Sequence, residues 1–131
     1  MLIGEASRKT GLSAKTIRFY SDEGLVHPRK DPFTGYRFFT EKDLTRLRFL
    51  KRARQFNFSI RDCSQLLSLY DQPDRSSLDV KTIASNKLRE LDAKLEELNS
   101  LRNQLLSLVE RCKGDHKPDC PILEAFAAER N

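Results

Sequence analysis

The chain has 131 residues and a mass of 15.2 kDa, which fits one compact domain or one small domain with an extension. With 38% hydrophobic and 33% charged residues, and no apolar run long enough to cross a bilayer, the composition excludes a disordered chain and a membrane protein. Residues 1–70 carry 14 Lys and Arg against 7 Asp and Glu, so this half is either a footprint for nucleic acid or simply a solvated basic surface.

The first part of the chain predicts two short helices joined by a turn. A helix over 3–10 ends at Gly11, which allows a turn. Ser13 is a suitable N-cap for a second helix over 14–23, because its hydroxyl can accept a hydrogen bond from a free backbone N–H. Helix, turn and helix form the helix-turn-helix pattern, which an ordinary corner between two helices shares.

The character of the sequence changes over residues 25–39. Phe33-Thr34-Gly35 suits a hairpin turn, and the residues after it favour β-structure, so we expect a small β-hairpin, or wing. Two capping patterns of Ser or Thr followed three residues later by Asp then predict helices over about 41–55 and 60–70. Residues 1–70 are therefore expected to form a winged helix-turn-helix domain.

A hinge loop over 71–78 and one long helix over 79–111 are expected next. Leucines recur along this helix in steps of 3 and 4 residues, with one irregular interval, as in a coiled coil. They are Leu88, Leu91, Leu95, Leu98, Leu101, Leu105 and Leu108. A single helix cannot bury such a stripe, so a second copy of the chain is the simplest partner, the alternative being the chain's own N-terminal domain.

Three cysteines without a secretory signal indicate a cytoplasmic protein with reduced thiols and no membrane partner. Cys112 ends the leucine stripe, and seven residues separate it from Cys120 within the terminal loop and tail, 112–131. Two thiolates suit a soft monovalent ion such as Cu(I), whereas Zn²⁺ prefers four ligands. A labile disulfide and two unrelated cysteines are the alternatives. Cys63 is expected in the core, and His116 is expected to face solvent.

A set of basic and aromatic side chains could contact DNA. Lys15 and Arg18 are neighbours on one side of the helix 14–23, and Arg37 stands beside Tyr36 on the wing. Basic side chains interleaved with aromatic rings suit contacts to phosphates and base edges. The predicted contact residues are Lys15, Arg18, Tyr20, Tyr36, Arg37 and Arg54. For Tyr20, the ring could pack in the core while the hydroxyl still reaches a phosphate.

Three short segments, IRFY over 17–20, EGL over 23–25 and GYR over 35–37, in combination resemble the DNA-binding domain of MerR-type transcription regulators. The likeness extends over nearly the whole chain, and the terminal C-x7-C-P pattern resembles that of the family's copper-efflux regulators. The resemblance implies a mainly helical winged helix-turn-helix protein that forms an antiparallel coiled-coil homodimer. It also implies a transcription activator on double-stranded promoter DNA, which responds to metal by distorting the promoter for RNA polymerase.

The resemblance also bears on which metal is bound. Divalent-metal members of the family carry a cysteine near the start of the long helix, where this chain has Ser77, and its neighbour Ser76 is also serine. The missing third thiolate favours Cu(I), with Ag(I) and Au(I) equally acceptable. A thiol–disulfide redox sensor and a divalent-metal-responsive regulator are the alternatives. The sequence shows no Gly-rich phosphate loop, nucleophile triad or carboxylate pair, so we do not expect an enzyme.

Overall fold

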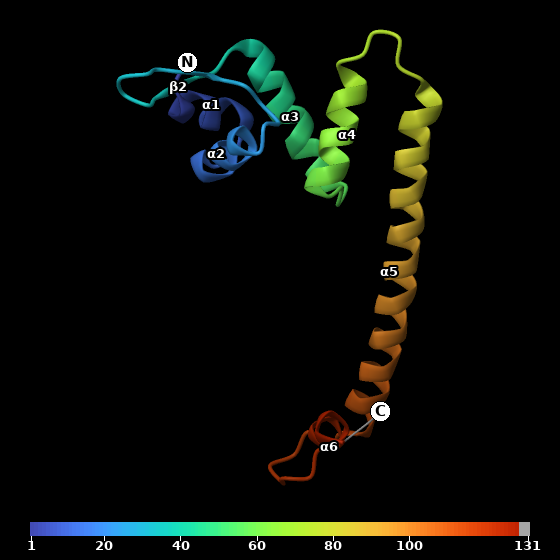
Figure 1. Cartoon of the computed structure of the whole chain (residues 1–131). Helices are drawn as coiled ribbons and strands as arrows, with labels where there is room; N and C mark the ends of the chain where they lie inside the picture. Colours follow the sequence, from blue (N-terminus) through green and yellow to red (C-terminus); the bar gives the residue numbers. More distant parts are fainter. Residues whose placement is uncertain (129–131) are drawn as a thin grey trace. The chain divides into compact units, whose positions relative to one another are not determined.

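The computed structural model describes residues 1–128 and is mainly helical (Figure 1). In chain order its elements are α1 (Ile3–Thr10), α2 (Ala14–Asp22), β1 (Arg29–Lys30), β2 (Arg37–Phe38), α3 (Glu41–Gln55), α4 (Ile60–Tyr70), α5 (Ser77–Arg111) and α6 (Pro121–Ala127). The chain divides into two compact units, residues 1–87 and the residues from Leu88 onward. Within 1–128, none of the helices combines the length and the apolar character needed to cross a membrane.

The expected helix-turn-helix pair is present as α1 and α2. Gly11 ends α1 at a φ of 75° and its N–H donates to the Ser7 carbonyl at 2.9 Å. Lys51 of α3 donates from Nζ to the Thr10 carbonyl at 3.0 Å, so its cation lies at the C-terminus of α1. Ser13 caps α2 as predicted, with Oγ accepting the Thr16 N–H at 3.1 Å.

The wing is a hairpin with very short strands. β1 and β2 pair antiparallel, with Arg29 opposite Phe38 and Lys30 opposite Arg37. In the loop between them, Asp31 Oδ1 accepts the N–H groups of the residues two and three positions on, at 2.8 and 3.2 Å. These two backbone hydrogen bonds hold the pKa of Asp31 below its ordinary value. The ordered loop presents Phe33 at its tip, with 96% of the side chain exposed.

The helices after the wing begin at the predicted caps. Thr40 and Asp43 form a reciprocal capping box at the start of α3, and Ser59 Oγ accepts the Asp62 N–H at 3.0 Å at the start of α4. Between the two helices, Asn57 has a positive φ of 65°. The sequence therefore predicted both helix starts through their caps.

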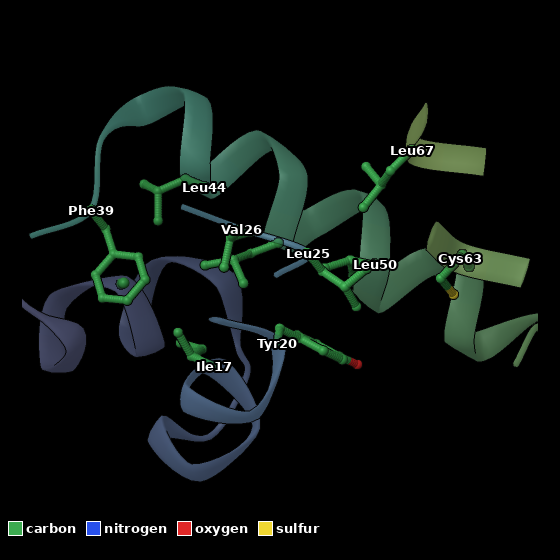
Figure 2. Packing of buried hydrophobic residues seen from close by; sticks show 12 residues of the cluster. Ile17, Tyr20, Leu25, Val26, Phe39, Leu44, Leu50, Cys63 and Leu67 are labelled. Atoms are coloured by element: carbon green, nitrogen blue, oxygen red, sulfur yellow. The ribbon is translucent and has the colours of Figure 1, made fainter. Parts of the chain in front are cut away.

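One hydrophobic core holds the first unit together, and Figure 2 shows its packing. Leu44, Leu47 and Leu50 of α3 belong to one buried cluster with Ile17 of α2 and with Phe39, which follows the wing. All of these side chains are fully or almost fully buried. Burial of each is worth about 1.5–3 kcal/mol, so the core fixes α2 and the base of the wing to α3.

The long helix begins earlier than expected. α5 starts at Ser77 rather than at residue 79, because Ser76 Oγ accepts the Leu78 N–H at 3.2 Å and so caps the first turn. The terminal helix, α6, starts at Pro121, within the segment expected as loop and tail. None of the residues of α5 is buried, and most of its predicted leucine stripe is exposed.

Candidate metal centre and nucleic-acid interface

The two terminal cysteines stand at helix boundaries and face each other. Cys112 directly follows the last residue of α5, and its N–H donates to the Leu108 carbonyl at 3.1 Å. Cys120 is the N-cap of α6. The two Sγ atoms lie 4.0 Å apart, and both thiols are free and partly buried. The fold thus brings the predicted pair together across the intervening loop.

The start of α6 polarises the Cys120 thiol. Backbone N–H groups of the first turn, that of Leu123 foremost and then that of Ile122, lower the pKa of Cys120, while partial burial acts in the opposite direction. The neighbouring Cys112 thiol lowers it further. A thiolate is the form that binds soft metal ions, so the local structure favours the ligating form.

The distance between the sulfurs fits two ligands of one ion. A metal–thiolate bond is about 2.3 Å long, so two sulfurs on opposite sides of an ion are about 4.6 Å apart, close to the observed 4.0 Å. Within residues 1–128, no cluster of three or more His, Cys, Asp and Glu side chains could hold a metal. His116 is exposed on the loop, as expected. Within the described part of one protomer, the pair therefore offers a two-coordinate site.

The start of α5 carries two serine hydroxyls and no thiol. Ser77 is the first residue of the helix and is exposed, and Ser76 caps it. The remaining cysteine, Cys63, lies fully buried on α4, where burial raises the pKa of its thiol. Figure 2 shows it among the core side chains.

A basic surface lies on α2. Lys15 and Arg18 are exposed on this helix, as predicted. Phe19, which the sequence analysis did not select, is 45% exposed beside them. Its signal in the sequence was its position next to Arg18, one turn after Lys15, and an exposed aromatic ring can make apolar contact with a thymine methyl group.

The aromatic candidates differ in accessibility. Tyr36 is 63% exposed on the wing, whereas Tyr20 is only 5% exposed and packs in the core (Figure 2). Burial raises the pKa of Tyr20, and the nearby Arg54 cation acts in the opposite direction. Arg54 is exposed and donates from Nη1 to the Phe58 carbonyl at 2.7 Å. Contact of Tyr20 and Arg54 with DNA stays a prediction.

Arg37 is tied to α2. Its Nη2 lies 2.7 Å from Asp22 Oδ1 in an ion pair, and its Nη1 donates to the Arg18 carbonyl at 3.4 Å. The wing and the last turn of α2 are therefore linked by one guanidinium. A contact from this side chain to a phosphate also stays a prediction.

Comparison with protein families gives two matches that together span most of the chain. The model described as "MerR HTH family regulatory protein" matches residues 1–69, and the model described as "MerR, DNA binding" matches residues 44–108. The first covers α1 to α4 without the last residue of α4, and the second begins within α3 and ends within α5.

Curated proteins and solved structures give matches over nearly the full length. The chain is 51% identical over 127 residues to the HTH-type transcriptional regulator HmrR of Rhizobium leguminosarum, covering 97% of this chain and 98% of the relative. It is 44% identical over 124 residues to CueR of Salmonella typhimurium, covering 95% and 90%. The structure of PbrR691 from Ralstonia metallidurans CH34 in complex with lead(II) matches with a TM-score of 0.82 and 30% identity, covering 97% and 99%.

Proposed function

This chain belongs to the MerR family of DNA-binding, metal-responsive transcription regulators, and from that premise we propose that it is a Cu(I)-responsive activator acting as a homodimer on promoter DNA. Ag(I) and Au(I) would be accepted by the same site, because they share the softness of Cu(I). Its relatives are regulators, so the chain is not an enzyme. We place its action in the cytoplasm, with RNA polymerase as its partner at the promoter.

The observation that carries the metal assignment is the pair of sulfurs 4.0 Å apart, with no third donor near them among residues 1–128. Cys112 and Cys120 would hold the ion. Two thiolates neutralise a monovalent ion and leave one negative charge, whereas a divalent ion prefers more ligands. When bound, the ion supplies a link between the end of α5 and the start of α6.

Divalent metals are the second candidate, because the solved relative PbrR691 is in complex with lead(II). Ser77 and Ser76 argue against this reading, since a hydroxyl is a poor substitute for a third thiolate. A thiol–disulfide sensor is a further candidate, favoured by the proximity of the two free thiols. A disulfide bond of about 2.05 Å would require the sulfurs to approach by about 2 Å.

On the DNA side, we propose that Lys15 and Arg18 enter the major groove and that Tyr36 contacts phosphate from the wing. Their exposure on α2 and on the wing supports these roles. Two copies of the chain, joined along α5, would read two half-sites related by symmetry. The exposed leucines of α5 support the homodimer, which we propose to be an antiparallel coiled coil.

In the proposed switch, the metal ion binds one conformation of the dimer more tightly than the other. A ligand shifts two conformations only by its unequal affinity for them, and ordering of the segment 112–120 would supply that inequality. Bending and untwisting of DNA costs on the order of 1–6 kcal/mol, which is within reach of such coupling. The dimer would therefore occupy the promoter with and without metal, and metal would change the distortion of the DNA.

The test is an anaerobic titration of the purified protein with Cu(I), Ag(I), Zn(II) and Pb(II), read by transcription from its own upstream promoter. We expect activation by the monovalent ions alone. Cys112→Ser and Cys120→Ser should each abolish activation with operator affinity nearly unchanged, because each removes one of only two ligands. His116→Ala, a change in the same loop, should retain the response.

Three results would contradict this function in distinguishable ways. Activation by Pb(II) or Zn(II) would identify a divalent sensor. A copper response that survives either serine substitution would show that the two-thiolate site is wrong. Reversible pairing of the two thiols by peroxide, without protection by Cu(I), would favour the redox sensor.

A further inference from the structure

We propose that Arg37 is a positioning residue, which fixes the wing to the end of α2 and so sets the spacing of the two elements for DNA. The inference rests on the proposed contacts of α2 and the wing with DNA. It replaces a phosphate contact of Arg37 by a contact within the protein.

The geometry around the guanidinium supports this role. The Nη2 atom of Arg37 lies 2.7 Å from Asp22 Oδ1, and Nη1 lies 3.4 Å from the Arg18 carbonyl oxygen. The side chain is only 20% exposed, so its charged end is held against the protein. Asp22 is the last residue of α2, where a cation is also favoured by the helix dipole, and Arg18 lies one turn earlier on the same helix.

The wing needs such a link because its own pairing is weak. Each strand has two residues, and an isolated two-stranded hairpin is at best marginally stable in water. The Asp31 hydrogen bonds order the loop at the tip but do not attach it to the rest of the domain. Arg37 lies on β2 opposite Lys30, so its link to α2 fixes the strand pair next to the loop.

The pair also removes a charge that DNA would repel. Asp22 has a side chain that is 63% exposed at the end of the helix that bears Lys15 and Arg18. An unpaired carboxylate there would oppose approaching phosphates. Pairing with Arg37 compensates it, and the same pair holds the wing in place.

The deciding variant is Asp22→Asn. Its affinity is measured for the same promoter duplex that supports transcription by the unaltered chain. If Arg37 acts through Asp22, this change weakens affinity about two- to fivefold, the range expected for a partly exposed ion pair, although it removes a negative charge. If Arg37 instead contacts phosphate, removing that charge leaves affinity equal or tighter. Asp22→Glu, which keeps the carboxylate, should retain most of the affinity.

The control is Glu23→Gln, which removes the same charge one residue further along and leaves the Arg37–Asp22 pair intact. It should bind the operator at least as tightly as the unaltered chain. Melting followed by circular dichroism shows that every variant is folded.

Arg37→Gln and the double variant complete the cycle. A positioning role predicts that the double variant binds no more weakly than the weaker single variant, and that Arg37→Gln leaves the salt dependence of binding unchanged. A fall in the slope of log K against log salt of about 0.9 per phosphate would overturn the inference, as would unchanged affinity in Asp22→Asn. If the unaltered chain itself fails to bind promoter DNA, the proposed function fails together with this inference.

Discussion

Gly11 is a single residue on which the junction of the first two helices depends. Its φ of 75° is costly for a residue with a side chain, and an added Cβ would lie 2.5 Å from Lys51 Nζ. We expect Gly11→Ala to lower the free energy of unfolding by about 1–2 kcal/mol from the backbone alone, with a further loss if Lys51 releases the Thr10 carbonyl. The free energy of unfolding, measured in urea, contains both losses.

Gly24→Ala is the matched comparison for that prediction. Gly24 has nearly the same φ, 76°, but nothing lies within 4 Å of its would-be Cβ. It should show the backbone cost alone. Equal losses in the two variants would show that the Lys51 contact contributes nothing.

The three cysteines should separate by reactivity. Cys63 is fully buried and burial raises its pKa, so its thiol is shielded from reagents and less ionised than an ordinary thiol. We expect iodoacetamide to modify two thiols per chain rapidly and Cys63 only on unfolding, as counted by mass spectrometry. Rapid modification of all three in the folded protein would contradict the burial of Cys63.

The site residues show where reasoning from sequence ends. The pairing of Cys112 and Cys120 could be predicted because a short loop separates them, and the structure brings their sulfurs within 4.0 Å. The partner of Arg37 could not, because Asp22 lies 15 positions earlier and the two meet only once the hairpin packs on α2. The burial of Tyr20 is likewise a result of packing, and spacing alone left it open.

Among the elements, the helices with local caps were the most predictable. The starts of α2, α3 and α4 follow from Ser13, Thr40 and Ser59, whose side chains accept a backbone N–H three residues on. α5 was placed two residues late, because its cap Ser76 lies in a polar stretch with several possible capping residues. The wing strands were expected from composition, but their register depends on the turn.

The leucine stripe of α5 predicts the effect of one charged substitution. Leu98, Leu101 and Leu105 line an exposed apolar groove together with Arg102, Leu106 and Val109. Leu101→Glu would place a carboxylate in the proposed dimer seam, so we expect a shift from dimer to monomer and loss of operator binding. Sedimentation equilibrium measures the shift.

Ser100→Glu provides the control for the seam. Ser100 is exposed and lies two positions from both Leu98 and Arg102, a rotation of about 200°, so it faces away from the groove. This variant should remain a dimer of unchanged affinity. Dimers in both variants would mean that the chain associates through another surface.

At the scale of the whole molecule, charge is divided along the chain. Residues 1–70 carry the excess of Lys and Arg, whereas the remainder has 10 Lys and Arg against 12 Asp and Glu. The first part contains the exposed cations of α2, so we expect operator affinity to fall steeply with salt. With six to ten phosphate contacts per dimer, the loss between 50 and 200 mM salt is about 10³–10⁵-fold.

The response to metal, unlike operator affinity, should not depend on salt concentration. Because the sensor pair lies in the less basic part and the proposed coupling acts on bound dimers, the ratio of transcription with and without Cu(I) should stay constant at saturating protein. Fluorescence anisotropy measures the operator affinity, and in vitro transcription measures the ratio of transcription with and without Cu(I). A ratio that falls in parallel with affinity would show that metal acts by recruiting the protein to DNA.

The position of both donor sulfurs at helix boundaries has a consequence for protein engineering. Cys112 continues from α5 and Cys120 begins α6, so the pair is oriented by its own flanking helices. The seven residues between them supply no thiol, and apart from Gly114, whose φ of 65° favours glycine, they can be varied without changing the two donors. We therefore expect the segment to keep its two-sulfur site when it is grafted onto the end of another long helix.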